Sequence, residues 1–208
     1  SFYYIENDSK ENETIEIIVP QSVGIRIISL SFCGSDNILS ELSKIKIDCP
    51  GVGSTNLYGG HRLWHAPQFP KRTHLPDDQP VNIKEVKSGI EITSQTEAKT
   101  GIQKSMRISL PNNNANVIID HTLKNKGVWP IETAPWAITS LKPGGIAILP
   151  QMTEFIDSDG VWPNRCLAFW PFTDINSPYI HWGNRYIFVE ASMQKDRIKF
   201  GFPNRDSW

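Results

Sequence analysis

The chain has 208 residues, of which 39% are hydrophobic and 21% charged, and its formal net charge is −1. This length is sufficient for one substantial core and is ordinary for a single all-β domain. The near-neutral charge gives no electrostatic reason to expect nucleic acid or an anionic membrane as a partner, and no apolar run approaches the roughly 20 residues that span a bilayer.

The first quarter of the chain reads as short strands separated by turn residues. Residues 14–19 and 23–30 are rich in β-branched side chains, and the Pro20-Gln-Ser turn between them predicts a hairpin. Residues 38–42 form a short strand candidate, whereas residues 49–60, rich in Gly, Pro, Ser and Asn, predict a loop. Arg26 lies inside an apolar strand, so it either extends to an edge or points into a polar pocket.

The most distinctive stretch of the chain is Gly59-Gly60 with the polar and aromatic residues that follow them. Adjacent glycines permit positive φ or a close backbone approach. His61 and Arg62 donate hydrogen bonds and Trp64 offers a flat apolar face, which are the groups that hold a polyhydroxylated ligand. In a regular strand these three cannot share one face, unless a bulge near the glycines re-aims them. The alternative is a tight turn with Trp64 filling a core.

Four prolines interrupt residues 66–81, so we expect a loop there rather than a helix or an inner strand. Long loops in compact domains are often functional. Arg72, Asp77 and Asp78 lie on this segment, each of them a solvated charge or a ligand contact.

The remaining sequence predicts a meander of strands separated by turn residues, at residues 83–87, 90–97, 103–110, 117–124, 129–139, 146–149, 185–192 and 197–202. Period-2 alternation is clearest in residues 90–97 and 106–110, and no segment makes a convincing amphipathic helix. We therefore expect an all-β fold, an antiparallel sandwich or barrel, in a single domain over residues 1–208.

The three cysteines are odd in number and lack CxxC spacing, which argues against a disulfide framework or a zinc knuckle. We expect free, mostly buried thiols, which fit a reducing compartment such as the cytoplasm slightly better. The N-terminus lacks the features of a signal peptide, although a signal removed before residue 1 stays an alternative, so the sequence fixes no localisation.

Four stretches resemble the galactose mutarotase-like superfamily, and in particular its aldose 1-epimerase-like members: residues 23–30 with 37–39, residues 58–67, residues 121–127 with 131–139 and 143–145, and residues 169–174 with 182–186. The Gly-Gly-His-Arg-Leu-Trp run is the most specific of them. The resemblance implies a large antiparallel β-sandwich that binds a sugar on a concave face. It also implies that a glutamate base and a histidine acid open and reclose the sugar ring, which needs two groups of different proton affinity.

Carried over to this chain, the resemblance makes His61 the candidate catalytic residue and Arg62, Trp64, Arg72 and Trp136 the candidate sugar-binding residues. Trp136 stands where the family keeps its acid histidine. The family's base belongs to a C-terminal region that we expect this chain to lack, so no residue here is assigned as the base. His121, one strand earlier, reads as structural.

We therefore expect a carbohydrate-binding protein of the aldose 1-epimerase type that interconverts sugar anomers. The alternatives are a sugar-binding module without catalysis and a purely structural β-sandwich domain. The expected partner is a small sugar or sugar derivative, without cofactor or metal. A helical metal pair of His61 and His65 conflicts with the glycines before them and Pro67 after them, and a site that adds Asp77 is the remaining metal alternative.

Overall fold

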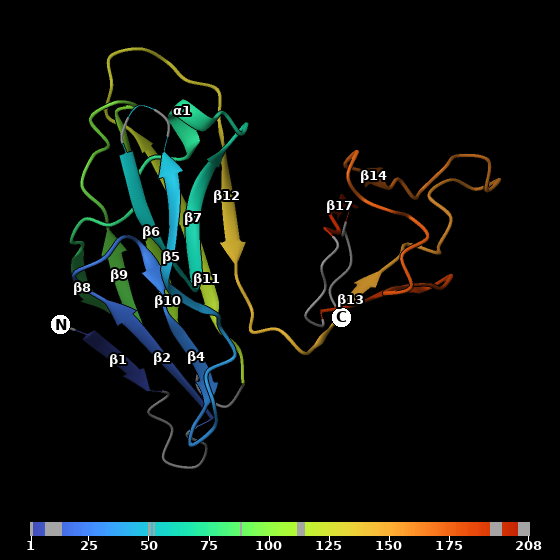
Figure 1. Cartoon of the computed structure of the whole chain (residues 1–208), viewed down its shortest axis with the longest axis horizontal. Helices are drawn as coiled ribbons and strands as arrows, with labels where there is room; N and C mark the ends of the chain where they lie inside the picture. The colour runs from blue at the N-terminus through green and yellow to red at the C-terminus, as the bar shows by residue number, and fades with distance from the viewer. Residues whose placement is uncertain are drawn as a thin grey trace. The chain divides into compact units, whose positions relative to one another are not determined.

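The computed structural model describes residues 2–6, 14–49, 51, 53–87, 89–111, 115–191 and 197–203. The chain divides into two compact units, residues 1–142 and residues 143–208, and each is described by itself (Figure 1). The expected single domain over the whole chain stays a prediction.

The first unit is made of strands and one turn of helix: β1 (Phe2–Glu6), β2 (Ile15–Pro20), β3 (Arg26–Ile27), β4 (Ser29–Phe32), β5 (Glu41–Cys49), β6 (Gly53–Gly59), β7 (His61–Ala66), α1 (Pro70–Thr73), β8 (Asn82–Val86), β9 (Gly89–Thr93), β10 (Ile102–Ser109), β11 (Ile118–Asn125) and β12 (Ala134–Thr139). The strands pair in the orders β1-β2-β4, β5-β6, β12-β7-β3 and β11-β10-β9-β8. Every pairing is antiparallel, and the predicted meander is the sheet β8 to β11.

The core of this unit collects side chains from several sheets. Ile17 of β2, Leu63 of β7, Ile92 of β9 and Met106 of β10 are all 0% exposed and belong to one cluster. Burying such a side chain contributes about 1.5–3 kcal/mol. Because strands of different sheets share this core, the predicted antiparallel all-β sandwich is confirmed.

Two local predictions were wrong, and a third holds only in part. Residues 53–59 are not loop but strand β6, because they pair with β5 across six residue pairs despite their turn-forming composition. The proline-rich segment does contain helix, the single turn α1, because Pro70 stands at its first position, where the missing N–H costs nothing. The short strand expected at residues 38–42 is an isolated bridge at Leu39 followed by the longer β5.

Gly59 and Gly60 join β6 to β7 and both have positive φ, +79° and +72°. A Cβ on Gly60 would lie 2.1 Å from the carbonyl oxygen of Ile27, and one on Gly59 would lie 2.1 Å from that of Ser40. Both expected uses of the pair are therefore present at once, the positive φ and the close backbone approach.

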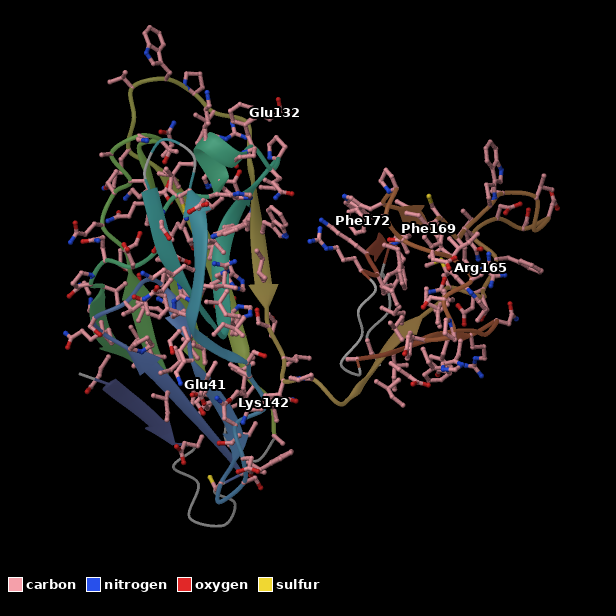
Figure 2. The ribbon with its side chains drawn as sticks, in the orientation of Figure 1. Glu41, Glu132, Lys142, Arg165, Phe169 and Phe172 are labelled. Atoms are coloured by element: carbon pink, nitrogen blue, oxygen red, sulfur yellow. The ribbon has the colours of Figure 1, made fainter. Side chains whose placement is uncertain are left out.

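The second unit contains β13 (Ile146–Pro150), β14 (Ala168–Phe169), β15 (Ile180–Trp182), β16 (Tyr186–Glu190) and β17 (Phe200–Gly201), paired in the orders β13-β16-β15 and β14-β17. Phe169, Trp182 and Phe200 form an aromatic cluster with ring centroids 5.8–6.5 Å apart. Figure 2 labels Phe169 among the side chains of this unit.

The cysteines are free, as expected, but the prediction of mostly buried thiols was wrong. Cys49, at the end of β5, is buried, whereas Cys33 and Cys166 are exposed because both lie outside the strands.

Candidate functional site

Strand β7 carries most of the predicted site residues, and it divides them between two faces. Its register with β12 runs unbroken from His61 to Ala66, so side chains alternate. The irregularity near the glycines lies between β5 and β6, at Leu42 and Lys46, and does not re-aim β7. His61 therefore lies on one face, and Arg62 lies on the other.

Arg62 belongs to a buried network of two guanidinium groups that share one carboxylate. Arg26 Nη2 lies 2.6 Å from Asp77 Oδ1, and Arg62 Nη1 lies 3.7 Å from Asp77 Oδ2. Arg26 is 0% exposed and also donates to the carbonyl oxygens of Gly59, at 3.0 Å, and Leu57, at 3.2 Å. Arg26 therefore does not extend to an edge and lies instead in a buried polar network. Burial lowers the pKa of Arg62, while Asp77 opposes that shift.

Trp64 lies beside Arg62 on the same face, and other side chains already cover its ring. The Arg62 guanidinium carbon lies 4.2 Å from the ring centroid of Trp64, and the rings of His74 and Trp136 lie 4.9 and 5.6 Å from it. Trp64 is only 7% exposed. Of the two predicted stacking residues, Trp136 is the more accessible, and the sugar-binding role of both stays a prediction.

His61 lies on the opposite face and forms a pair with His121. The two Nε2 atoms are 2.9 Å apart, and His61 Nδ1 lies 2.8 Å from Thr139 Oγ1. Burial, with a smaller contribution from His121, lowers the pKa of His61 to about 4. A neutral imidazole with both nitrogens engaged is a poor proton donor near pH 7. From the sequence, His121 was expected to be a structural residue, and the pair, which joins residues 60 positions apart, was not predicted.

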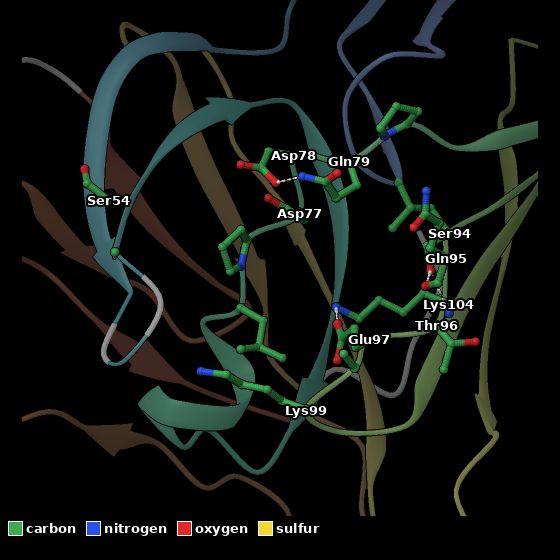
Figure 3. Close-up of a pocket in the computed structure, with 17 residues that line it drawn as sticks. Ser54, Asp77, Asp78, Gln79, Ser94, Gln95, Thr96, Glu97, Lys99 and Lys104 are labelled. Atoms are coloured by element: carbon green, nitrogen blue, oxygen red, sulfur yellow. Dashed lines mark hydrogen bonds and ion pairs between the residues drawn. The ribbon is translucent and has the colours of Figure 1, made fainter.

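A pocket of about 510 Å³ opens beside Asp77, and Figure 3 shows its lining. Asp77, Asp78 and Gln79 lie across from Ser94 and its neighbours, and the pocket is lined by Gly24, Ile25, Gly53, Ser54, residues 75–80, residues 94–99 and Lys104. Asp78 accepts hydrogen bonds from the Thr55 hydroxyl, at 3.1 Å, and from the Gln79 amide, at 2.9 Å.

Lys104 lies at the inner side of this pocket and is only 3% exposed, with its ammonium 2.5 Å from Glu97 Oε1. This pair was not predicted from the sequence. A signal was present, because Lys104 falls in register with Ile102, Met106 and Ile108 on the core-facing side of β10. A charge at an inward position of an alternating strand indicates a buried polar site.

Arg72, the remaining predicted site residue, lies away from this pocket and lines a second one of about 440 Å³, together with His65. The predicted residues are thus distributed over the Arg62 face, the His61 face and the second pocket. The pocket beside Asp77 is lined by none of the five residues predicted for the site.

Comparison with known proteins gave no match to a family model, to a curated protein or to a solved structure. Among the described residues, no three His, Cys, Asp or Glu side chains gather as a metal site. No helix in the same residues has the length and apolar character needed to cross a membrane.

Proposed function

We propose that the first unit is a carbohydrate-binding sandwich of the aldose 1-epimerase-like type, with the sugar held in the pocket beside Asp77. The observation that carries this proposal is the chemistry of the lining. Acidic and amide residues, namely Asp77, Asp78, Glu97, Gln79 and Gln95, line a space of about 510 Å³. This volume falls in the usual range for small-ligand sites, and these groups are the acceptors and donors that sugar hydroxyls need.

The surrounding contacts support a pocket whose polar groups are fixed before a ligand arrives. Asp77 is held by Arg26, Asp78 by Thr55, and Glu97 by Lys104. Preorganised groups lose little conformational entropy on binding, which favours affinity for a small polar ligand.

The alternative of sugar binding without catalysis is favoured over the assignment of His61 as the acid. His61 does not line this pocket, and its pKa of about 4 leaves it almost entirely neutral near pH 7. The other predicted binding residues on β7, Arg62 and Trp64, act here as support for Asp77 and for one another rather than as walls of the pocket.

Binding is tested by isothermal titration calorimetry with glucose, galactose and their uronic acids. We expect Asp78→Asn to weaken binding at least about tenfold, because it removes a charged acceptor from the wall. Asp36→Asn is the matched control, since Asp36 is exposed and lies outside the pocket. An equal loss of sugar affinity in both variants, or an unchanged affinity in Asp78→Asn, would refute the pocket beside Asp77 as the sugar site.

Epimerisation is a second candidate, favoured by one observation. The pocket holds the Asp78 carboxylate on one segment and the Lys104 ammonium, paired with Glu97, on another. These are the two kinds of group that ring opening requires, a base and an acid. NMR of freshly dissolved α-glucose and α-galactose tests it: faster anomeric equilibration, lost in Asp78→Asn and kept in His61→Ala, would support these residues, and binding without acceleration would exclude them.

A further inference from the structure

The second pocket, of about 440 Å³, lies beside α1, and Figure 2 shows one of its residues, Glu132, at that end of the first unit. It is lined by His65, Phe69, Lys71, Arg72, Lys99, Thr100, Ile102, Ile131, Glu132 and Thr133. The proposed sugar-binding function does not involve it, except that Lys99 borders both pockets.

Three cations and one carboxylate border this pocket. Among the described residues, no ion pair joins Lys71, Arg72 or Lys99 to a carboxylate. Arg72 Nη2 donates to the carbonyl oxygen of Pro67 at 2.9 Å, and Lys99 Nζ donates to that of Gly51 at 2.8 Å. These bonds hold the cations in place without neutralising them, so the pocket has a net positive lining.

The deepest polar side chain of the pocket is without a partner. His65 is 1% exposed, and neither of its ring nitrogens makes a hydrogen bond. Arg72 Nε is also buried and unpaired. A buried donor without an acceptor destabilises the fold, so such groups usually mark a missing partner.

The neighbouring hydroxyls make hydrogen bonds to other groups, and Thr100 Oγ1 also accepts from the Ile102 N–H. Thr133 donates to the carbonyl oxygen of Ala66 at 2.6 Å, and Thr100 donates to Glu97. The buried groups of the pocket that lack a partner are the His65 ring and the Arg72 Nε–H, beside three cations, and an acceptor with several oxygens is the ligand that matches donors and positive charge.

We propose that this pocket binds an oxyanion of the phosphate or sulfate type, with His65 and Arg72 as its inner donors and Lys71 and Lys99 at its rim. The forked guanidinium of Arg72 suits a tetrahedral or planar oxyanion. Glu132 opposes binding by charge repulsion. The proposal does not depend on sugar binding, because the pocket differs and the probe carries no sugar.

Titration of the whole chain with inorganic phosphate at low ionic strength, followed by calorimetry, tests the site. We expect Arg72→Gln to weaken binding about tenfold or more, because a charge-assisted donor is lost. Glu132→Gln should strengthen binding, a gain that a misfolded variant cannot give. The control Lys84→Gln, which changes an exposed lysine on β8, should leave binding unchanged.

A second readout follows the ¹⁵N signals of His65. Burial first, and then Lys104 and Arg72, lower the pKa of His65, while Glu97 opposes them. Bound phosphate should raise this pKa, because an adjacent anion favours the imidazolium. Phosphate binding no tighter than chloride, an unchanged His65 pKa at saturation, or equal losses in Lys84→Gln and Arg72→Gln would overturn the proposal. Tighter binding of a phosphate monoester than of inorganic phosphate would support it and make the anion part of a larger ligand.

Discussion

His61 and His121 face each other from β7 and β11, with their Nε2 atoms 2.9 Å apart. In the neutral pair one Nε2 carries the shared proton and the other accepts it, so protonation of the accepting Nε2 would break this hydrogen bond and charge one of the two rings. The folded pair therefore favours the neutral form of His61 and resists protonation, so acid destabilises the folded state.

The first prediction concerns acid stability. Folded His61 takes up a proton only near pH 4, whereas an unfolded histidine does so near pH 6.5. Between these values the unfolded state holds more protons, so the free energy of unfolding falls as pH drops from about 6.5 to about 4. The decrease in the free energy of unfolding that His61 causes is about 2–3 kcal/mol near pH 4, and it is absent well above pH 6.5. Urea denaturation of wild type and His61→Gln at pH 4.5 and 7 should show a smaller pH effect in the variant.

Lys84→Gln serves as the control for that series, because Lys84 is an exposed residue of β8. It should keep the wild-type pH dependence. An identical pH dependence in wild type and His61→Gln would show that the pair does not set acid stability.

The second prediction concerns the buried carboxylate of Asp77. The substitution Asp77→Asn keeps the side-chain shape but leaves Arg26, which is 0% exposed, without its counter-charge. Breaking one partner of a buried ion pair costs about 3–5 kcal/mol. Urea midpoints measure the change, and the exposed Asp36→Asn should stay within about 0.5 kcal/mol of wild type. An equally small change in the free energy of unfolding of Asp77→Asn would mean that solvent screens the Arg26–Asp77 ion pair.

The third prediction separates two uses of glycine. Gly60 and Gly34 have nearly equal φ, +72° and +77°, but a Cβ would meet the Ile27 carbonyl oxygen at 2.1 Å in Gly60 and nothing within 4 Å in Gly34. Gly34→Ala should therefore cost only the left-handed backbone penalty, about 1–2 kcal/mol. Gly60→Ala should cost more than about 4 kcal/mol or prevent folding, because backbone must move. Thermal melts measure the decrease in Tm of each variant relative to wild type. Equal decreases in the two variants would contradict this prediction.

The fourth prediction uses the cysteines as probes of folding. Cys33 and Cys166 are exposed, whereas Cys49 is 3% exposed and its thiol pKa is raised, first by burial and then by Asp77 and Asp78. A thiol reagent should therefore modify two cysteines quickly in the folded protein and the third only after denaturation. Three equal rates would show that β5 does not shield Cys49.

The sequence by itself determined the elements with a clear local pattern. Period-2 alternation predicted the meander β8 to β11, because one face of each strand must be apolar when it covers a core. The sequence also predicted an unusual backbone conformation at Gly59-Gly60. Only glycine tolerates the positive φ together with the close approach of another backbone that this junction requires. Where local composition and pairing disagreed, as in β6, the composition misled, because a partner strand can impose extension on Gly- and Ser-rich sequence.

Only the tertiary structure decided which polar residues meet. Pairing and packing bring Arg26 to Asp77 and His61 to His121 over separations of 51 and 60 residues. A strand fixes only which face its own side chains share, and here β7 sends Arg62 and His61 to opposite faces. What lies opposite each face depends on the register and stacking of other strands, and local sequence does not encode that information.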